Sequence, residues 1–199
     1  MEIRSLVCGA FATNTYVLEN NDELILIDPA CKAEKLDTIL EGKKLLAVLL
    51  THGHFDHIKA CDGLYKKHQM PIYMNMLDDE LTKDNTQGES FGLDNVPTIS
   101  SPITDLKEGK MNLGSFSFEV IFTPGHTRGS VCYLFDEAIF TGDTLFRGSV
   151  GRTDLKGGCM SALRESLRIF KEMNEDLLVY PGHEEPTCIG DELKYNPYF

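Results

Sequence analysis

The stretch THGHFDH, residues 51–57, sets three of the chain's six histidines close together and adds an aspartate. Burying imidazoles and carboxylates without partners costs free energy, so a bound ligand is the simplest reason for crowding them. The stretch follows LLAVLL, residues 45–50, an apolar run with the length and composition of a buried strand. The sequence therefore predicts a strand whose C-terminal end presents ligand-binding side chains.

Three more apolar runs end in the same manner, with small residues before a histidine or an aspartate. They are FEVIFTPGH (residues 118–126), EAIFTGD (137–143) and DLLVYPGH (176–183). Runs of this kind are typical of buried strands, whose tips emerge at the C-terminal edge of a sheet. We therefore expect the four tips to converge on one cleft. Of the six histidines, only His68, on a predicted helix surface, lies away from them.

The spacing within residues 52–57 predicts a metal site. Side chains two positions apart in an extended segment face the same way, so His52 and His54 can reach one cation together. Asp56 and His57, at the turn into the next helix, can reach a second cation. Imidazole nitrogens and carboxylate oxygens are suitable ligands for zinc, and also for iron or manganese. No thiolate is needed.

The composition suits one globular domain. The chain has 199 residues, of which 42% are hydrophobic, enough for a continuous core. It contains no linker rich in Pro, Gly or Ser, so we expect a single domain over residues 1–199, made of two similar halves. A net charge of −12 argues against counterion-release binding to nucleic acid or to an anionic membrane surface.

No part of the sequence is predicted to enter a membrane. The first residues lack the apolar core of a signal peptide, and no apolar run approaches the length of a transmembrane helix. The six cysteines are scattered without a CxxC motif, mostly in apolar surroundings. They predict buried free thiols in a reducing compartment, and we expect a cytoplasmic protein.

Alternation and helical periodicity predict a similar order of elements in the two halves. In the first half we expect strands over residues 3–8, 15–20, 23–29, 45–52 and 71–74, and helices over 32–42 and 57–69. The polar stretch over residues 75–108 predicts a short helix and a long loop. In the second half we expect hairpin strands over 110–126 and 130–143, an irregular segment over 144–158, a helix over 159–173 and a strand over 176–183. Two β-rich halves with outer helices predict an α/β fold, a four-layer αββα sandwich.

These motifs resemble those of the metallo-beta-lactamase superfamily, in which THGHFDH is followed by residues equivalent to His126, Asp143 and His183. More narrowly, TPGHTRGSVC (123–132), GDTLFRGSVGRTD (142–154) and YPGHEEPT (180–187) are similar to the hydroxyacylglutathione hydrolase, or glyoxalase II, family, especially its short bacterial members. The resemblance runs from about residue 2 to the C-terminus and implies the metallo-beta-lactamase fold. Typical glyoxalase II enzymes carry a separate C-terminal helical domain, which we do not expect here because only residues 184–199 follow the last histidine.

Residue by residue, the resemblance implies a ligand set for two divalent metal ions, with zinc as the first choice and iron or manganese as alternatives. The set is His52, His54 and His126 for the first metal, Asp56, His57 and His183 for the second, and Asp143 as the bridge. All seven positions are filled. Asp143 stands where one lactamase class uses a cysteine, and His54 stands where the flavodiiron proteins place a glutamate, so both residues argue against those relatives.

Two arginines after Asp143 are candidates for substrate contact. Arg152 occupies the position at which glyoxalase II has a basic residue that contacts a glutathione carboxylate, and a guanidinium suits bidentate carboxylate binding. The alternative is an Arg152–Asp154 pair that only shapes the loop. Arg147 is the second candidate. Phe91, within the loop over residues 84–98, could cover the cleft or only anchor that loop.

The predicted chemistry is thioester hydrolysis. Two dications sharing a water would lower its pKa to about 7 and supply hydroxide, which Asp56 is expected to orient. A thiol, with a pKa of about 8.5, departs with little help, whereas an amine needs a general acid that the sequence does not offer. We therefore expect a small-molecule thioester of the S-lactoylglutathione kind as substrate.

Three alternatives stay open at this point. One is a persulfide dioxygenase, which shares GRTD-like sequence and the histidine motif but uses a single iron. Another is a lactonase or other ester hydrolase. The third is a metal-binding protein without activity, which the cysteine-free donor set disfavours because structural zinc sites are usually rich in cysteine.

Overall fold

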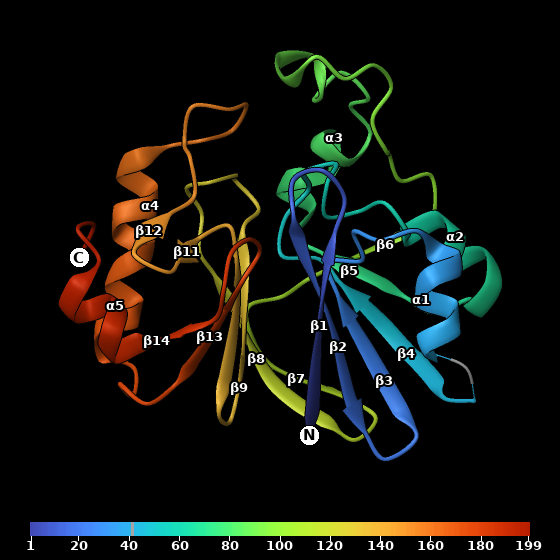
Figure 1. Cartoon of the computed structure of the whole chain (residues 1–199), viewed down its shortest axis with the longest axis horizontal. Helices are drawn as coiled ribbons and strands as arrows, with labels where there is room; N and C mark the ends of the chain where they lie inside the picture. The colour runs from blue at the N-terminus through green and yellow to red at the C-terminus, as the bar shows by residue number, and fades with distance from the viewer. Residues whose placement is uncertain (41) are drawn as a thin grey trace.

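Two six-stranded β-sheets pack against each other in the computed structural model, which describes residues 1–40 and 42–199 (Figure 1). The first sheet contains, in spatial order, β1 (Glu2–Cys8), β2 (Thr13–Asn20), β3 (Glu23–Ile27), β4 (Lys44–Leu49), β5 (Ile72–Met74) and β6 (Ile103–Asp105). The second contains β14 (Thr187–Cys188), β13 (Leu178–Pro181), β10 (Ala138–Gly142), β9 (Val131–Phe135), β8 (Phe116–Phe122) and β7 (Gly109–Leu113). A small separate hairpin joins β11 (Leu145–Phe146) to β12 (Ser149–Val150).

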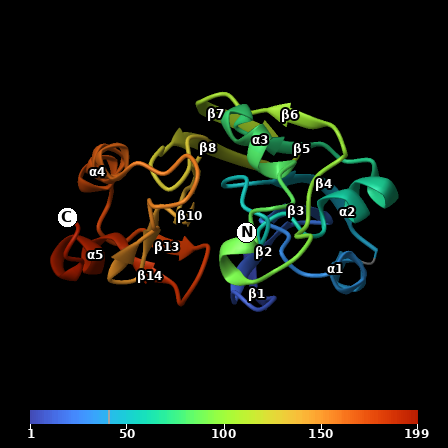
Figure 2. The same ribbon diagram turned by 90° about the horizontal axis from the view of Figure 1, so that it is seen from above.

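Helices cover the outer face of each sheet, and Figure 2 shows them on opposite sides of the molecule. The first sheet carries α1 (Ala33–Leu40) and α2 (Cys61–His68), and the second carries α4 (Met160–Leu167) and α5 (Ile189–Tyr195). The remaining helical segments are η1 (Met76–Asp78), α3 (Asp79–Thr82), η2 (Glu89–Phe91) and η3 (Arg168–Glu172). In the part of the chain that the structure describes, no helix is long and apolar enough to span a bilayer.

Three apolar cores hold the four layers together. In β3, Leu24 and Leu26 belong to the core beneath α1 and α2, whereas Ile25 and Ile27 belong to the core between the sheets. Successive side chains of a strand face opposite sides, so a strand buried on both faces is apolar throughout. A third core, around Phe170, lies between the second sheet and its helices. The predicted four-layer α/β sandwich is confirmed.

Strand direction explains why the ligand-bearing tips meet. Strands β3 to β6 run parallel, and β13 runs parallel to β10. Because β8 and β10 are both antiparallel to β9, β8 also points in the direction of β10. Backbone hydrogen bonds join the two sheets at this edge: Val131 donates to the carbonyl of Thr51 at 2.8 Å, and Asn14 donates to that of Gly182 at 2.7 Å.

In the first half, the main differences from the prediction concern the two helices and the polar stretch. The helix predicted over residues 57–69 begins only at Cys61, because His57 lies in a turn and donates its backbone N–H to the carbonyl of His54 at 3.1 Å. The helix predicted over 32–42 is α1, and residue 41 lies outside the described residues. The stretch 75–108 contains η1, α3 and η2, but also β6, which was not predicted. The side chains of β6 are mostly exposed, so this strand leaves no apolar pattern.

The second half also contains elements that were not predicted. The irregular segment 144–158 holds the β11–β12 hairpin, and the helix predicted over 159–173 is α4 continued by η3. Beyond His183, the chain forms β14 and α5. A strand of two residues is too short to show alternation, which explains why β14 escaped prediction.

The prediction that all cysteines are buried free thiols is wrong for four of the six. Cys8 and Cys31 form a disulfide that joins the end of β1 to the loop after β3, with Cα atoms 5.0 Å apart. The two cysteines are 23 residues apart, so the sequence does not show that they pair. Folding of strands β1 to β3 brings them together. The free cysteines are Cys61 and Cys132, which are buried as predicted, and Cys188 and Cys159, which are half-buried and exposed. A reducing, cytoplasmic compartment stays a prediction.

We predict that the denatured, unreduced protein exposes four thiols and that reduction raises the count to all six. A thiol-reactive chromophore measures both counts in denaturant. It cannot react with Cys8 and Cys31 while they form the disulfide. As a control, Cys159→Ser should lower each count by one. Six thiols before reduction would contradict the disulfide.

Candidate metal centre

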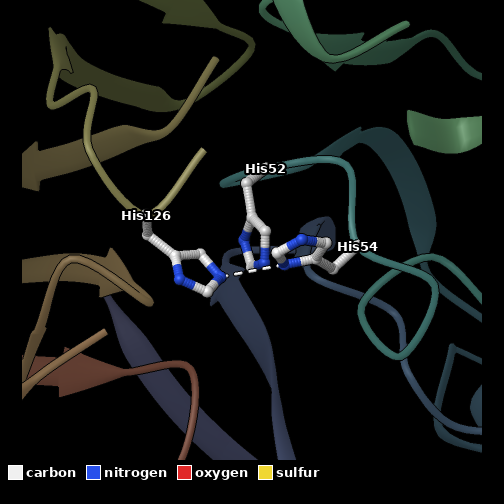
Figure 3. A group of neighbouring side chains, drawn as sticks. All are labelled: His52, His54 and His126. Atoms are coloured by element: carbon white, nitrogen blue, oxygen red, sulfur yellow. Dashed lines mark hydrogen bonds between the residues drawn. The ribbon is translucent and has the colours of Figure 1, made fainter. Parts of the chain in front are cut away.

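His52, His54 and His126 form one cluster of possible metal ligands (Figure 3). The first two come from the loop after β4 and the third from the loop after β8, and all three are buried. Their ligand atoms lie within 4.8 Å of one another, and Nδ1 of His54 is 2.9 Å from Nε2 of His126. Three imidazoles that converge in this manner are a suitable ligand set for one cation.

Asp56, His57 and His183 form a second cluster, whose ligand atoms also lie within 4.8 Å of one another. Oδ2 of Asp56 is 3.6 Å from Nε2 of His57 and 3.5 Å from Nε2 of His183. The structure therefore brings together residues that are far apart in the sequence, as the strand-tip pattern predicts.

Asp143, at the end of β10, lies between the two clusters. Its Oδ1 is 3.4 Å from Nε2 of His57, in the second cluster. Its Oδ2 is 3.4 Å from Nε2 of His126, in the first cluster, and 3.4 Å from Nε2 of His183. One carboxylate thus reaches both clusters, which is the placement that a bridging ligand requires.

Three buried polar atoms of these clusters have no hydrogen-bond partner within residues 1–40 and 42–199: Nε2 of His52, Nε2 of His57 and Oδ1 of Asp143. Leaving a buried polar atom unpaired costs about 1–3 kcal/mol. All three atoms belong to the predicted ligand set, and divalent cations bind such lone pairs. The residues therefore fit a metal centre.

In His126 and His183, the ring nitrogen that faces away from the centre is hydrogen-bonded. Nδ1 of His126 donates to the carbonyl of Arg152 at 2.7 Å, and Nδ1 of His183 donates to that of Phe11 at 2.9 Å. A donor bond at Nδ1 leaves the lone pair of Nε2 free to bind a metal. Thr13 supports the second cluster as well, because its hydroxyl donates to Oδ2 of Asp56 at 2.8 Å.

Asp28 is a functional residue that was not predicted. Its carboxylate lies 2.9 Å from Nδ1 of His57 and accepts the N–H and hydroxyl of Thr51 at 2.8 and 2.6 Å. Both oxygens are therefore occupied, so Asp28 orients His57 and is a poor candidate for a ligand. The sequence feature that could have identified Asp28 is the run ELILIDP, residues 23–29, a fifth apolar strand that is followed by an acidic residue.

Electrostatics distinguish the two clusters. Burial lowers the pKa of His52 well below its ordinary value and that of His54 to about 3, so both are neutral imidazoles. Burial opposes the charged form of His57 too, but the carboxylates of Asp56, Asp143 and Asp28 outweigh it and raise the pKa of His57 to about 10. The second cluster therefore carries a proton that a metal must displace.

A cavity of about 530 Å³ opens over both clusters, a size that suits a small-molecule ligand. Its wall includes Phe11, Phe55 and Phe91, whose rings pack edge to face, with the Phe11 centroid 5.4 Å from Phe55 and 5.1 Å from Phe91. Phe91 thus lines the cleft, as the covering alternative requires. One part of the cavity wall beside the metal ligands is therefore aromatic.

The structure separates the two candidate arginines. Arg152 lines the cavity, where its guanidinium donates to both carboxylate oxygens of Asp154 at 2.7 and 2.6 Å and lies 5.7 Å from the centroid of Phe91. Arg147 pairs with the exposed Glu185 at 3.0 Å and does not line this cavity. Substrate contact by either arginine stays a prediction.

Residues 8–183 of the chain match the metallo-beta-lactamase superfamily. The probable metallo-hydrolase YqgX of Bacillus subtilis is 35% identical over 205 residues, covering 100% of this chain and 97% of that protein. The hydroxyacylglutathione hydrolase GloC of Haemophilus influenzae is 32% identical over 207 residues, covering 100% of this chain and 98% of that protein.

Solved structures agree with this assignment. The B3 metallo-beta-lactamase BLEG-1 superposes with a TM-score of 0.91 at 37% identity, covering 99% of each chain. TTHA1623 in a di-iron-bound form gives a TM-score of 0.90 at 36% identity, covering 98% of this chain and 100% of the other. ETHE1 from Myxococcus xanthus gives 0.79 at 30% identity, covering 99% of this chain and 84% of the other.

We predict that binding of Zn²⁺ to the metal-free protein releases protons. With a pKa of about 10, His57 is protonated at neutral pH and must lose its proton before Nε2 can bind a metal. Raising the pH from about 7 to 9 weakens this competition, so the affinity should rise by up to about tenfold per pH unit. Calorimetry in buffers of different ionisation enthalpy counts the protons.

His68→Ala is the matched control, because His68 contacts Asp37 at 2.7 Å on α1 and does not belong to the clusters. This variant should release as many protons as the wild type. A binding enthalpy that is independent of the buffer, together with a flat pH profile, would contradict the protonated state of His57.

Proposed function

The chain belongs to the metallo-beta-lactamase superfamily, and from this premise we propose that it is a metallo-hydrolase whose substrates are small thioesters of the S-lactoylglutathione kind. The observation that carries the proposal is the pair of ligand clusters on either side of Asp143, with unpartnered buried atoms on His52, His57 and Asp143. The relative named as a hydroxyacylglutathione hydrolase supports the thioester class.

We assign the two clusters to two divalent ions. His52, His54 and His126 would hold one ion, and Asp56, His57 and His183 the other, with Asp143 shared between them. Bound there, two such ions would lower the pKa of a shared water to about 7 and polarise a carbonyl oxygen. Zinc is the proposed metal, and the di-iron form of TTHA1623 makes iron the alternative.

Asp56 is the residue that we propose to orient the attacking water and to take up its proton. It lines the cavity, so its carboxylate can reach a bound substrate. The hydroxyl of Thr13 donates to Oδ2 at 2.8 Å and fixes the plane of the carboxylate relative to the cavity. The apolar rings of Phe11 and Phe55 beside it limit the access of bulk water.

The cavity favours a leaving group that departs without a proton. Lys156 lines it, but hydrogen bonding to Glu80 at 2.8 Å and the charge of Asp84 raise the pKa of Lys156 further above neutrality. A group that holds its proton so firmly is a weak general acid. Arg152 cannot give up a proton. A thiolate needs no such donor, so thioesters are better substrates here than amides.

The thiol part of the substrate can still be anionic. Arg152 and Asp154 form an ion pair that is open to solvent, where screening weakens the attraction. A substrate carboxylate can therefore replace Asp154 on the guanidinium at little cost. This exchange reconciles the observed pair with the predicted role of Arg152 in carboxylate binding.

Two other reactions have specific support. The similarity to BLEG-1 favours hydrolysis of β-lactams, and the similarity to ETHE1, with the GRTD stretch at residues 151–154, favours a persulfide dioxygenase with one iron. A lactonase has only the general suitability of the metal centre. The leaving-group argument weighs against β-lactams, because their cleavage yields an amine.

We predict that the protein purified with its native metal hydrolyses S-lactoylglutathione without consuming oxygen. One sample should be divided among four assays: metal content, thioester hydrolysis, hydrolysis of a chromogenic cephalosporin and oxygen uptake on glutathione persulfide. Two metals per chain with thioester turnover support the proposal. One iron with oxygen uptake, or turnover of the cephalosporin alone, would overturn it.

We predict that Asp56→Asn lowers kcat for the thioester by about 10²–10⁴-fold, since the amide cannot accept the proton of the attacking water. Metal analysis of the same sample shows whether the loss is chemical or follows from a lost ion. Asp136→Asn is the control, because Asp136 is exposed in the turn between β9 and β10. Wild-type kcat in Asp56→Asn would contradict the assigned role.

A further inference from the structure

Asp78 is a buried carboxylate that the proposed chemistry does not use. It is the last residue of η1, in the polar stretch between β5 and β6, and its exposed fraction is 0%. Burial of a carboxylate is costly unless hydrogen bonds satisfy its oxygens. The contacts of Asp78 therefore show what its position accomplishes.

Within residues 1–40 and 42–199, the hydrogen bonds that the carboxylate of Asp78 accepts come from the two loops that carry the first ligand cluster. Its Oδ2 accepts the backbone N–H of Gly53 at 3.0 Å and the hydroxyl of Thr127 at 2.6 Å. Its Oδ1 accepts the backbone N–H of Gly129 at 2.7 Å. Gly53 lies between His52 and His54, and Thr127 directly follows His126.

The close approach of Asp78 depends on glycine at both loops. A Cβ atom on Gly53 would lie 2.9 Å from Cβ of Asp78, and one on Gly129 would lie 2.7 Å from its Cγ. Cβ contacts of this length essentially never occur, so any larger residue would push the carboxylate away from the loop. The loops and the carboxylate are thus fitted to each other.

The second cluster has different supports. Asp28 contacts His57, the carbonyl of Phe11 accepts from His183, and Thr13 donates to Asp56. The hydrogen bonds of Asp78 reach none of these residues. Asp28 contacts the side chain of His57 and also accepts from Thr51, beside His52. The side-chain hydrogen bonds of Asp78, in contrast, go only to the loops that carry the first cluster.

We infer that Asp78 is a positioning residue that holds the His52–His54 loop and the His126 loop at the spacing needed by the first metal, and that it thereby sets the affinity of that cluster alone. It touches neither the metal ligands' side-chain nitrogens nor the cavity wall. Its action is mechanical, through Gly53, Thr127 and Gly129.

The variant Asp78→Asn tests this inference with little change of volume. The amide nitrogen places a donor against an N–H or hydroxyl donor, so at least one of the three hydrogen bonds is lost. Loss of a supporting contact of this kind typically lowers metal affinity about 10–100-fold, and we expect that factor for the first cluster only. The matched control is Asp79→Asn, because neighbouring Asp79 forms an ion pair with Lys83 and accepts no bond from either loop.

The readout is Zn²⁺ affinity, measured by competition with a chromophoric chelator on metal-free protein. His54→Ala removes a ligand of the first cluster, and His183→Ala removes a ligand of the second. The binding event that each variant loses is therefore assigned to that cluster. Asp78→Asn should weaken only the event that His54→Ala removes, and Asp79→Asn should match the wild type. Wild-type affinity in Asp78→Asn, or equal weakening of both events, would overturn the inference.

A further variant keeps the test decisive if Asp78→Asn does not fold, which thermal unfolding of the metal-free protein shows. Thr127→Val removes only the hydroxyl that donates to Asp78 at 2.6 Å, and it should weaken the same event by a smaller factor. Unchanged affinity in Thr127→Val would then overturn the inference. No substrate enters these measurements, so their outcome is independent of whether the protein hydrolyses thioesters.

Discussion

The metal centre is organised by buried polar atoms that have no hydrogen-bond partner within residues 1–40 and 42–199. Nε2 of His52, Nε2 of His57 and Oδ1 of Asp143 face a common space at the edge where the two sheets meet. Such crowding destabilises a folded chain unless a ligand satisfies these atoms. Metal binding therefore adds to the free energy of unfolding, since the unfolded chain has no such site. The two packed sheets bring the ligand-bearing strand ends together. A bound metal would offset the free-energy cost of burying these polar side chains side by side.

The two clusters are supported and charged in different ways, although one carboxylate, that of Asp143, reaches both. In the first cluster, burial lowers the pKa of His52 and His54 and keeps both neutral, and Asp78 ties the loops together. The second contains the carboxylate of Asp56, and its His57 lies beside Asp143 and is oriented by Asp28. This difference implies unequal metal affinities and unequal pH dependence. Asp56, the group proposed to handle the proton of the attacking water, belongs to the second cluster, where nearby carboxylates raise the pKa of His57.

The fold and the convergence of the candidate ligands were predictable from one sequence pattern, because an apolar run that ends in glycine and histidine indicates both a buried strand and a ligand-bearing tip. LLAVLLTHGH, residues 45–54, is such a strand. Residues that act through backbone contacts leave no such pattern. Asp78 sits in a polar stretch without periodicity, and only the folded loops show what it holds. The Cys8–Cys31 pair and the short strand β6 escaped prediction for the same reason, since both depend on tertiary contacts.

We propose that Asp143 and the six side chains around it bind two divalent ions. The decisive experiment is a crystal structure of the Zn²⁺-loaded protein, with anomalous difference maps recorded on both sides of the zinc edge. We expect two zinc peaks, one among His52, His54 and His126 and one among Asp56, His57 and His183, with the carboxylate of Asp143 between them. A single peak, or a peak bound by Asp28 in place of Asp143, would contradict it.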